Sequence, residues 1–126
     1  MSMLGTYPKD QGGADKEKLA ECIQACFECA QTCTACADAC LSEDMVAELG
    51  TCIRTNTDCA DICISTGKVL SRHAGYDANL TRAVLKACRI ACKACADECD
   101  QHAGAHGHCR ICTEACRRCE YAFGEL

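Results

Sequence analysis

The sequence has very few residues that break helices or fill a large apolar core. Pro8 is the one proline in 126 residues, and the aromatic residues are two Phe and three Tyr, with no Trp. The net charge of −5 leaves no basic excess for binding nucleic acid. No apolar stretch is long enough to span a bilayer. These absences argue against nucleic-acid and membrane partners, and they indicate a single domain with small core side chains.

The N-terminal segment has neither the basic start nor the apolar run of a signal peptide. We expect residues 1–14 to form a disordered tail, followed by one domain over residues 15–126. A cytoplasmic location is expected, because thiols stay reduced in that compartment. The cysteines number 17, and an odd count prevents complete disulfide pairing within the chain.

Turn residues divide the domain into stretches rich in Ala, Glu, Lys, Leu and Cys, which favour helix. Asp15, Ser42 and Asp77 are expected to cap helix N-termini. The connections are short, so neighbouring helices should run antiparallel. The predicted fold is all-α, an up-down four-helix bundle with a cysteine-lined core. The predicted helices cover residues 15–41, 44–72, 77–103 and 106–123.

The cysteines recur at the spacing of a helix face. In the first predicted helix, six of them follow at steps of four, three, four, three and four residues. At 100° per residue, they fall in a stripe about 80° wide. The third and fourth helices repeat the pattern, while the second has Asn56 at a stripe position. The candidate metal ligands are Cys22, Cys26, Cys29, Cys33, Cys36, Cys40, Cys52, Cys59, Cys63, Cys88, Cys92, Cys95, Cys99, Cys109, Cys112, Cys116 and Cys119.

Packing alone does not account for such a row of thiols, because leucine would bury more apolar area and oxidise less. Disulfides along one helix face would violate the bridge geometry. Metal binding fits better, since residues three or four apart have Cβ atoms about 5–6 Å apart, which suits one soft ion between two sulfurs. Zinc favours separate four-ligand sites, whereas copper(I) accepts few ligands and bridging thiolates. The pattern therefore favours multiple copper(I) ions.

Two other functions remain open on this reasoning. One is a protein that sequesters zinc or cadmium, in the manner of a metallothionein. The other is a thiol redox protein, which needs a cysteine of lowered pKa at a helix N-terminus. Cys109, beside His108, is the candidate for that role. No βαβ pattern accompanies it, so we expect no enzyme activity.

The two ends of the predicted bundle differ in chemistry. One end gathers imidazoles and a thioether, and we interpret it as the entrance for copper(I), with His102 the leading candidate there. His73 belongs to the other end and is expected on the surface. The residues of the entrance are Cys40, Met45, Cys99, His102, His106, His108 and Cys109. The opposite end is expected to be an apolar plug of Leu19, Leu70, Leu80, Val84 and Phe123.

The sequence resembles the cytosolic branch of the copper storage proteins. The resemblance rests on the cysteine stripes, on "CIRTNTDCADIC" at 52–63 and on "HCRICTEACRRCE" at 108–120. It implies a four-helix bundle that binds many copper(I) ions without catalysis and assembles as a homotetramer. All seventeen cysteines match core-lining positions of the family, and His102 and His108 match histidines near its bundle mouth. The expected partners are copper ions and a copper chaperone or low-molecular-weight thiol that delivers them.

Overall fold

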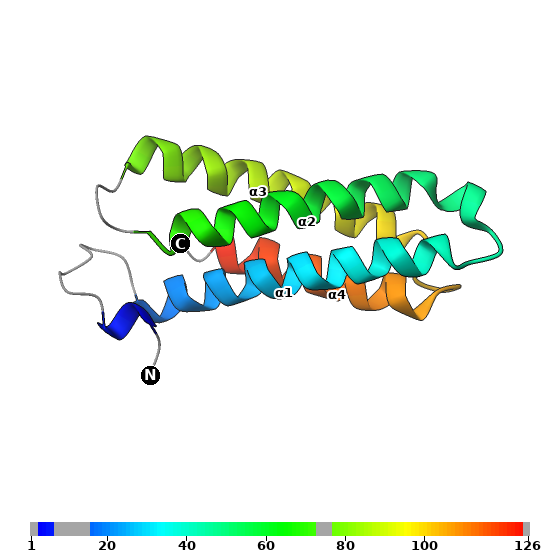
Figure 1. Ribbon diagram of the computed structural model, residues 1–126, viewed down its shortest axis with the longest axis horizontal. Coiled ribbons are helices and arrows are strands. Elements are labelled where there is room, and N and C mark those ends of the chain that lie inside the picture. Colours follow the sequence, from blue (N-terminus) through cyan, green and yellow to red (C-terminus); the bar gives the residue numbers. More distant parts are fainter. Residues whose placement is uncertain (1–2, 7–15, 73–76, 125–126) are drawn as a thin grey trace.

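The computed structural model describes residues 3–6, 16–72 and 77–124. Four long helices account for most of this part of the chain (Figure 1). Short 3-10 helices precede the first and the second of them. The elements are η1 (Met3–Thr6), α1 (Lys16–Leu41), η2 (Val46–Leu49), α2 (Gly50–Leu70), α3 (Ala78–Asp100) and α4 (Gly107–Gly124). The division of the chain into tail and bundle remains a prediction.

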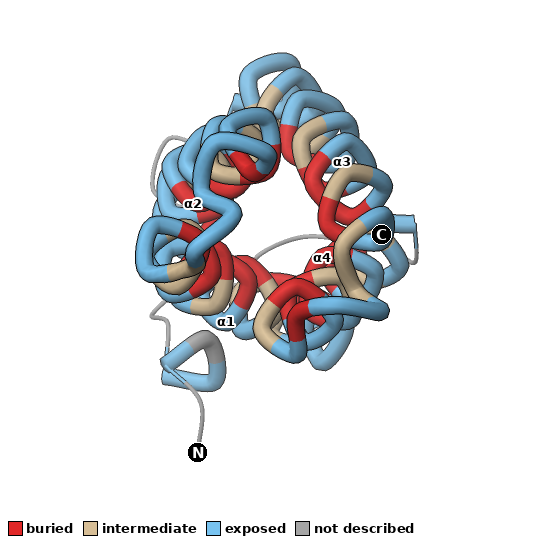
Figure 2. Tube along the Cα trace, turned by 90° about the vertical axis from the view of Figure 1, so that its right-hand side faces the viewer, coloured by how far each residue is buried: buried red, intermediate tan, exposed pale blue. Residues whose placement is uncertain are grey.

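The four helices form a closed ring around one core. α1 packs against α2 and α4, and α3 packs against the same two helices from the other side. Viewed along the bundle axis, the buried residues of all four helices face the centre and the exposed ones face outward (Figure 2). Each helix runs antiparallel to the next one in the chain (Figure 1). The predicted all-α, up-down four-helix bundle is therefore confirmed.

Three helices lie within three residues of their predicted bounds, but the second begins six residues later than expected. Ser42 does not cap it: the Ser42 N–H donates to the Ala39 carbonyl in a turn that ends α1. The chain then forms η2, whose Leu49 is fully buried, and α2 begins at Gly50 without a side-chain cap. α2 therefore begins directly after the buried Leu49. The sequence had predicted an earlier start, capped by the hydroxyl of Ser42.

The cap predicted for the third helix is confirmed. Asp77 has an extended backbone conformation, and its Oδ1 accepts from the backbone N–H groups of Asn79 at 2.9 Å and Leu80 at 3.1 Å. These are two of the N–H groups that a helix start leaves without partners. Asp15, the other predicted cap, and His73 lie outside the described residues.

Small side chains let the helices approach closely. α1 and α2 meet where Gly67 faces the ring of Phe27; a Cβ on Gly67 would lie 2.8 Å from the ring carbon Cζ. Among the described residues, the buried large apolar side chains are few, and most of the core consists of thiols, with some alanines, Asn56 and Thr66. These large side chains are Leu19, Leu49, Leu70 and Phe123.

The apolar plug is partly as predicted. Leu19, Leu70 and Phe123 are buried at the end of the bundle where α1 begins and α4 ends, and Val84 is half-buried there. Leu80 was predicted wrongly, since 55% of its surface is exposed. α3 has 23 residues and α4 has 18, so the first turns of α3 extend past the end of α4. Leu85 packs against the core in its place.

Candidate metal centre

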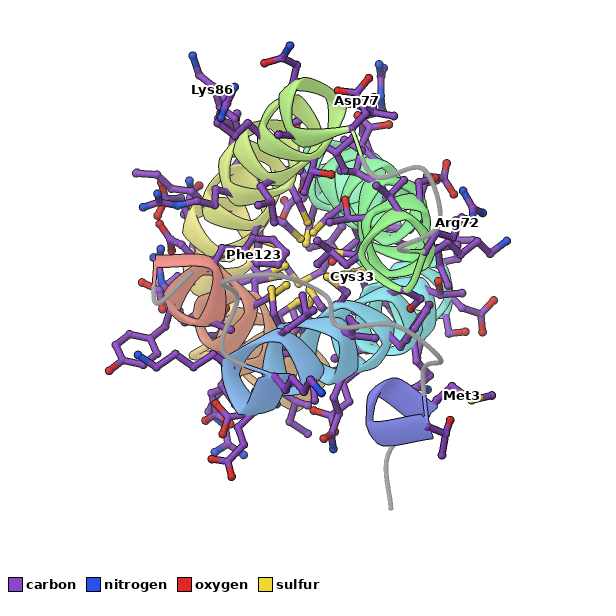
Figure 3. All side chains as sticks on the ribbon, turned by 90° about the vertical axis from the view of Figure 1, so that its left-hand side faces the viewer. Met3, Cys33, Arg72, Asp77, Lys86 and Phe123 are labelled. Carbon is purple, nitrogen blue, oxygen red and sulfur yellow. The ribbon has the colours of Figure 1, made fainter. Side chains whose placement is uncertain are left out.

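All seventeen cysteines are buried free thiols. Each helix contributes them from the face that its stripe predicted, so the stripes become four walls of one interior. Viewed from the end where α1 begins, the sulfur atoms gather in the middle of the bundle (Figure 3). The helical repeat places the thiols of each helix on one face, because positions three and four apart share a face, and the packing of the four helices turns these faces toward one interior.

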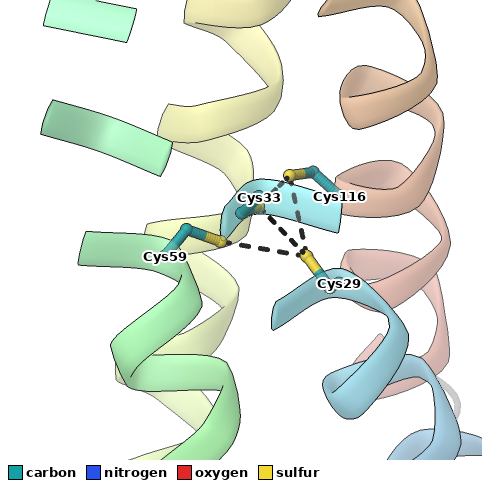
Figure 4. Close-up of side chains that lie close together, drawn as sticks. All are labelled: Cys29, Cys33, Cys59 and Cys116. Carbon is teal, nitrogen blue, oxygen red and sulfur yellow. Dashed lines mark hydrogen bonds between the residues drawn. The ribbon is translucent and has the colours of Figure 1, made fainter. Parts of the chain in front are cut away.

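Neighbouring sulfurs lie close enough for one ion to join them across helices. Cys29 Sγ is 3.8 Å from Cys33 Sγ on the same helix, 3.9 Å from Cys59 Sγ on α2 and 3.7 Å from Cys116 Sγ on α4 (Figure 4). Cys33 Sγ is in turn 3.8 Å from Cys95 Sγ on α3. Cys29 and Cys33, both on α1, are therefore within reach of sulfurs on α2, α3 and α4.

Such contacts continue along the core and define overlapping groups of possible ligands. Within each group, the donor atoms all lie within 4.8 Å of one another. A metal with bonds of about 2.3 Å to sulfur reaches two sulfurs up to about 4.6 Å apart, so each group can hold an ion after small movements. The all-cysteine groups include Cys29–Cys33–Cys59–Cys116, Cys29–Cys59–Cys63–Cys92, Cys33–Cys95–Cys112–Cys116 and Cys63–Cys88–Cys92–Cys119. Since these groups share members, their sulfurs would have to bridge successive ions.

Asn56 is the exception in the thiol row. Its side chain is fully buried, and its Oδ1 accepts from the thiols of Cys112 at 2.9 Å and Cys95 at 3.0 Å. The same oxygen lies 3.5 Å from Cys99 Sγ, and Nδ2 donates to Cys52 Sγ at 3.5 Å. A buried amide with both ends paired is stable in this place. Asn56 thus positions thiols of α2, α3 and α4 around itself.

The connections 42–49 and 101–106 close one end of the bundle, which we call the mouth (Figure 1). Here His108 Nδ1 faces the thiols, at 3.4 Å from Cys36 Sγ and 3.6 Å from Cys109 Sγ. With Cys40, these residues form a mixed group of three sulfurs and one imidazole nitrogen. The predicted gathering of His108, Cys40 and Cys109 at this end is confirmed in position.

A carboxylate that sequence reasoning missed organises the mouth. Glu43 Oε2 lies 2.6 Å from His106 Nδ1, and Oε1 lies 3.8 Å from His108 Nε2. The two imidazoles stack, with ring centroids 5.5 Å apart. Glu43 belongs to a connection far away in sequence from both histidines, so no spacing pattern could have linked them.

The other predicted mouth residues lie farther from the thiols. His102 Nε2 pairs with Glu98 Oε2 at 3.0 Å, one turn back on α3. Met45 is half-exposed, with 48% of its surface accessible. His106 is buried, and its Nδ1 pairs with Glu43 of the other connection. The imidazole that reaches the sulfurs in this structure is that of His108, whereas the sequence had favoured His102.

Burial keeps the thiols of the mouth protonated in the metal-free protein. It raises the pKa of Cys40 to about 11 and that of Cys109 to about 12; Cys52 adds to both shifts, and Cys36 opposes both. A redox nucleophile needs a lowered pKa instead. The geometry around Cys109 therefore argues against the thiol redox alternative.

The comparisons agree with this geometry. The family model described as "Copper storage protein" matches residues 15–126. No curated protein matches the chain. Among solved structures, the copper storage protein Ccsp of Streptomyces lividans, loaded with 10 copper equivalents, is 65% identical with a TM-score of 0.96, covering 97% of this chain and 92% of that one.

Two more structures of the Streptomyces lividans protein give the same result. A histidine-to-alanine variant is 64% identical with a TM-score of 0.90, covering 91% of this chain and 96% of that one. A structure from copper loading, with five coppers, is 65% identical with a TM-score of 0.88, covering 90% and 95%. In the described part of this chain, no helix is long and apolar enough to cross a membrane. The thiol-lined bundle and the family match lead to one conclusion: this chain belongs to the copper storage protein family.

Proposed function

We propose that this copper storage protein holds its copper(I) ions along the whole thiol core, in the cytosol, with sulfurs bridging successive ions. The observation that carries the proposal is the set of sulfur contacts between the four walls, among them Cys33 to Cys112 at 3.6 Å and Cys36 to Cys109 at 4.0 Å. The proposed ligands are the seventeen cysteines, with His108 and His102 at the mouth. The protein is not an enzyme, and its copper is cargo.

Charge explains why copper(I) suits this interior better than a divalent ion. Each thiol that binds releases one proton, and each copper(I) ion brings one positive charge, so matched numbers of ions and thiolates leave the core close to neutral. Uncompensated charge in a buried site is costly. Filling the core with divalent ions, each held by four thiolates, would leave two negative charges at every site.

Copper(I) is proposed to enter and leave at the mouth. The side chain of His108 is 25% exposed to solvent, and its Nδ1 points toward the thiols. His108 therefore lies between solvent and the thiol core. His102, His106 and Met45 surround the same end and offer softer neutral ligands on the way. The opposite end is closed by Leu19, Leu70 and Phe123, which offer no ligand atoms.

A rate measurement tests the entrance. Replacing His102, His106 and His108 by alanine should slow copper(I) uptake while the final number of bound ions changes little. His73, which was predicted at the other end, gives the matched control as His73→Ala. Uptake at the same rate in the triple variant would contradict the proposed entrance.

Two further properties are proposed on the resemblance to the family. The chain is expected to assemble as a homotetramer, and a copper chaperone or low-molecular-weight thiol is expected to deliver the ions. Exposed apolar side chains on α3 and α4, such as Ile90 and Ile111, are consistent with association. The mass of the native protein in solution tests the tetramer, and a monomer at micromolar concentration would refute it.

Storage itself is tested by competition. Reduced, metal-free protein is titrated anaerobically with copper(I), in the presence of a strong copper(I) chelator, and separately with zinc. Uptake of copper(I) comparable in number to the thiols supports storage, while binding of one ion or none defeats it. A higher capacity for zinc than for copper(I) would favour the sequestration of zinc or cadmium instead.

A further inference from the structure

We propose that the mouth can also bind one divalent ion of the zinc type, through Cys36, Cys40, Cys109 and His108, which are among the proposed copper(I) ligands. Three thiolates and one imidazole are a donor set that zinc takes in closed tetrahedral sites. The four all-cysteine groups described above offer sulfur alone, whereas this group adds an imidazole nitrogen. The inference goes beyond copper storage, because it assigns a second metal to one place in the bundle.

The donor atoms already have nearly the spacing that zinc requires. A tetrahedral ion with bonds of about 2.3 Å to sulfur and about 2.0 Å to nitrogen places its donors about 3.5–3.8 Å apart. His108 Nδ1 is 3.4 Å from Cys36 Sγ and 3.6 Å from Cys109 Sγ, and the two sulfurs are 4.0 Å apart. Cys40 Sγ lies within 4.8 Å of the other three atoms. Movements of about 1 Å close the site.

The nitrogen on the far side of the His108 ring, Nε2, gives a second, independent indication that Nδ1 binds a metal ion. Nε2 is buried and has no hydrogen-bond partner, although Glu43 Oε1 is 3.8 Å away. Histidines that bind metals usually donate their other ring N–H to a carboxylate, which fixes the tautomer. A shift of about 1 Å would bring Nε2 within hydrogen-bond distance of Glu43. An ion bound at Nδ1 would hold the ring in the tautomer that makes this bond.

Charge confines a divalent ion to the mouth. Four thiolates around zinc leave a net charge of −2, and the all-cysteine groups lie among fully buried residues, where such a charge is costly. Backbone N–H groups cannot compensate there, since the helices use them internally. At the mouth, three thiolates and a neutral imidazole leave −1. The Glu43 carboxylate adds a second negative charge there, but 31% of its side chain and 25% of that of His108 are exposed to solvent, which screens this charge. Solvent exposure therefore favours zinc at the mouth over the fully buried all-cysteine groups.

A divalent ion bound at this site would affect the rate at which copper(I) enters the core. Binding releases three protons to solvent, one from each thiol, and involves no change of oxidation state. The ion would then sit on Cys36 and His108, which lie on the proposed route of copper(I). A zinc-loaded mouth should slow the entry of copper(I) until the ion is displaced.

Cobalt(II) provides the test, because it adopts zinc sites and reports their geometry by absorption. Reduced, metal-free full-length protein is titrated anaerobically with cobalt(II), followed by zinc. We expect about one tetrahedral cobalt per chain, with sulfur-to-cobalt charge-transfer bands, and loss of the spectrum on adding zinc. Glu43→Gln should weaken cobalt binding about 10–100-fold, as for other carboxylates behind a metal-bound histidine.

Matched variants decide where the cobalt lies. His108→Ala should remove the spectrum, and His102→Ala, at the same end but paired with Glu98, should keep it. The absence of tetrahedral cobalt, or a spectrum that survives His108→Ala, would overturn the proposal. Circular dichroism of each variant shows that the bundle is intact. Copper(I) uptake by the same metal-free sample tests storage separately, so the two proposals can fail independently.

Discussion

Alkaline pH should destabilise the metal-free bundle through Cys40 and Cys109, the buried thiols of the mouth whose pKa values are raised. The pKa of Cys40 is raised from 9.0 to about 11 and that of Cys109 from 9.0 to about 12, with burial the largest cause of both. Below pH 9.0, both thiols are protonated in the folded and unfolded chains, so their contribution to stability is complete. Above it, the unfolded chain loses these protons first, and stability falls until the pH reaches the folded values.

The size of the loss follows from the pKa differences. One pKa unit corresponds to about 1.4 kcal/mol, so Cys40 accounts for about 3 kcal/mol and Cys109 for about 4 kcal/mol. The two thiols interact, since Cys40 raises the pKa of Cys109 whereas a hydrogen bond with Cys109 lowers that of Cys40, and the values do not simply add. A combined loss of a few kcal/mol is expected, which is a large part of the stability of a marginal domain.

Denaturant unfolding of reduced, metal-free protein at a series of pH values measures this loss. The control is Cys40→Ser with Cys109→Ser, because serine does not titrate in this range and the double variant should lose correspondingly less stability. If the free energy of unfolding of the natural sequence stays constant from neutral pH to pH 11, these thiols are not held protonated by burial, and the reasoning is wrong.

Two further predictions concern packing. Gly67→Ala places a Cβ 2.8 Å from Phe27 Cζ, at the far end of a side chain that is 38% exposed and can shift, and this cost is offset by the helix preference of alanine, about 1 kcal/mol. Gly50→Ala, with no atom within 4 Å of its Cβ, has no such cost and should be the more stable variant; equal thermal midpoints for the two variants would contradict this. Asn56→Ala should cost about 2–3 kcal/mol in the metal-free protein, since thiols of Cys95 and Cys112 lose their acceptor and a cavity remains. Asn56→Gln keeps the amide and serves as the comparison in denaturant unfolding, where an unchanged stability of Asn56→Ala would show that these bonds contribute nothing.

The periodic spacing of the cysteines explains why most of the fold could be predicted from the sequence. The steps of three and four between cysteines are a helical repeat, and they assigned the buried face of α1, α3 and α4 without reference to any neighbour. The same rule identified Asn56 as a member of the stripe, although it could not give its partners. Cys52 lies one turn back on the same helix, but the acceptor contacts of Oδ1 are with thiols of α3 and α4, and only the packing of the bundle selects those.

The errors arose where the tertiary structure decides local features. Ser42 has a good capping side chain, but burial of Leu49 delays the helix to Gly50. Leu80 fits the apolar stripe, but α4 is too short to cover it. Glu43 contacts His106 and His108 across the mouth, a pairing between two connections that no local pattern contains.

The central claim is that the copper capacity resides in the thiol walls, and removing one wall tests it most directly. The four cysteines of α3, which are Cys88, Cys92, Cys95 and Cys99, are replaced by serine, and the copper bound per chain is measured after anaerobic loading and gel filtration. Circular dichroism confirms that the metal-free variant remains helical. We predict that the natural sequence binds many copper(I) ions and that the variant binds clearly fewer, because every lost thiol removes a bridging ligand. An unchanged copper content in the folded variant would contradict the account.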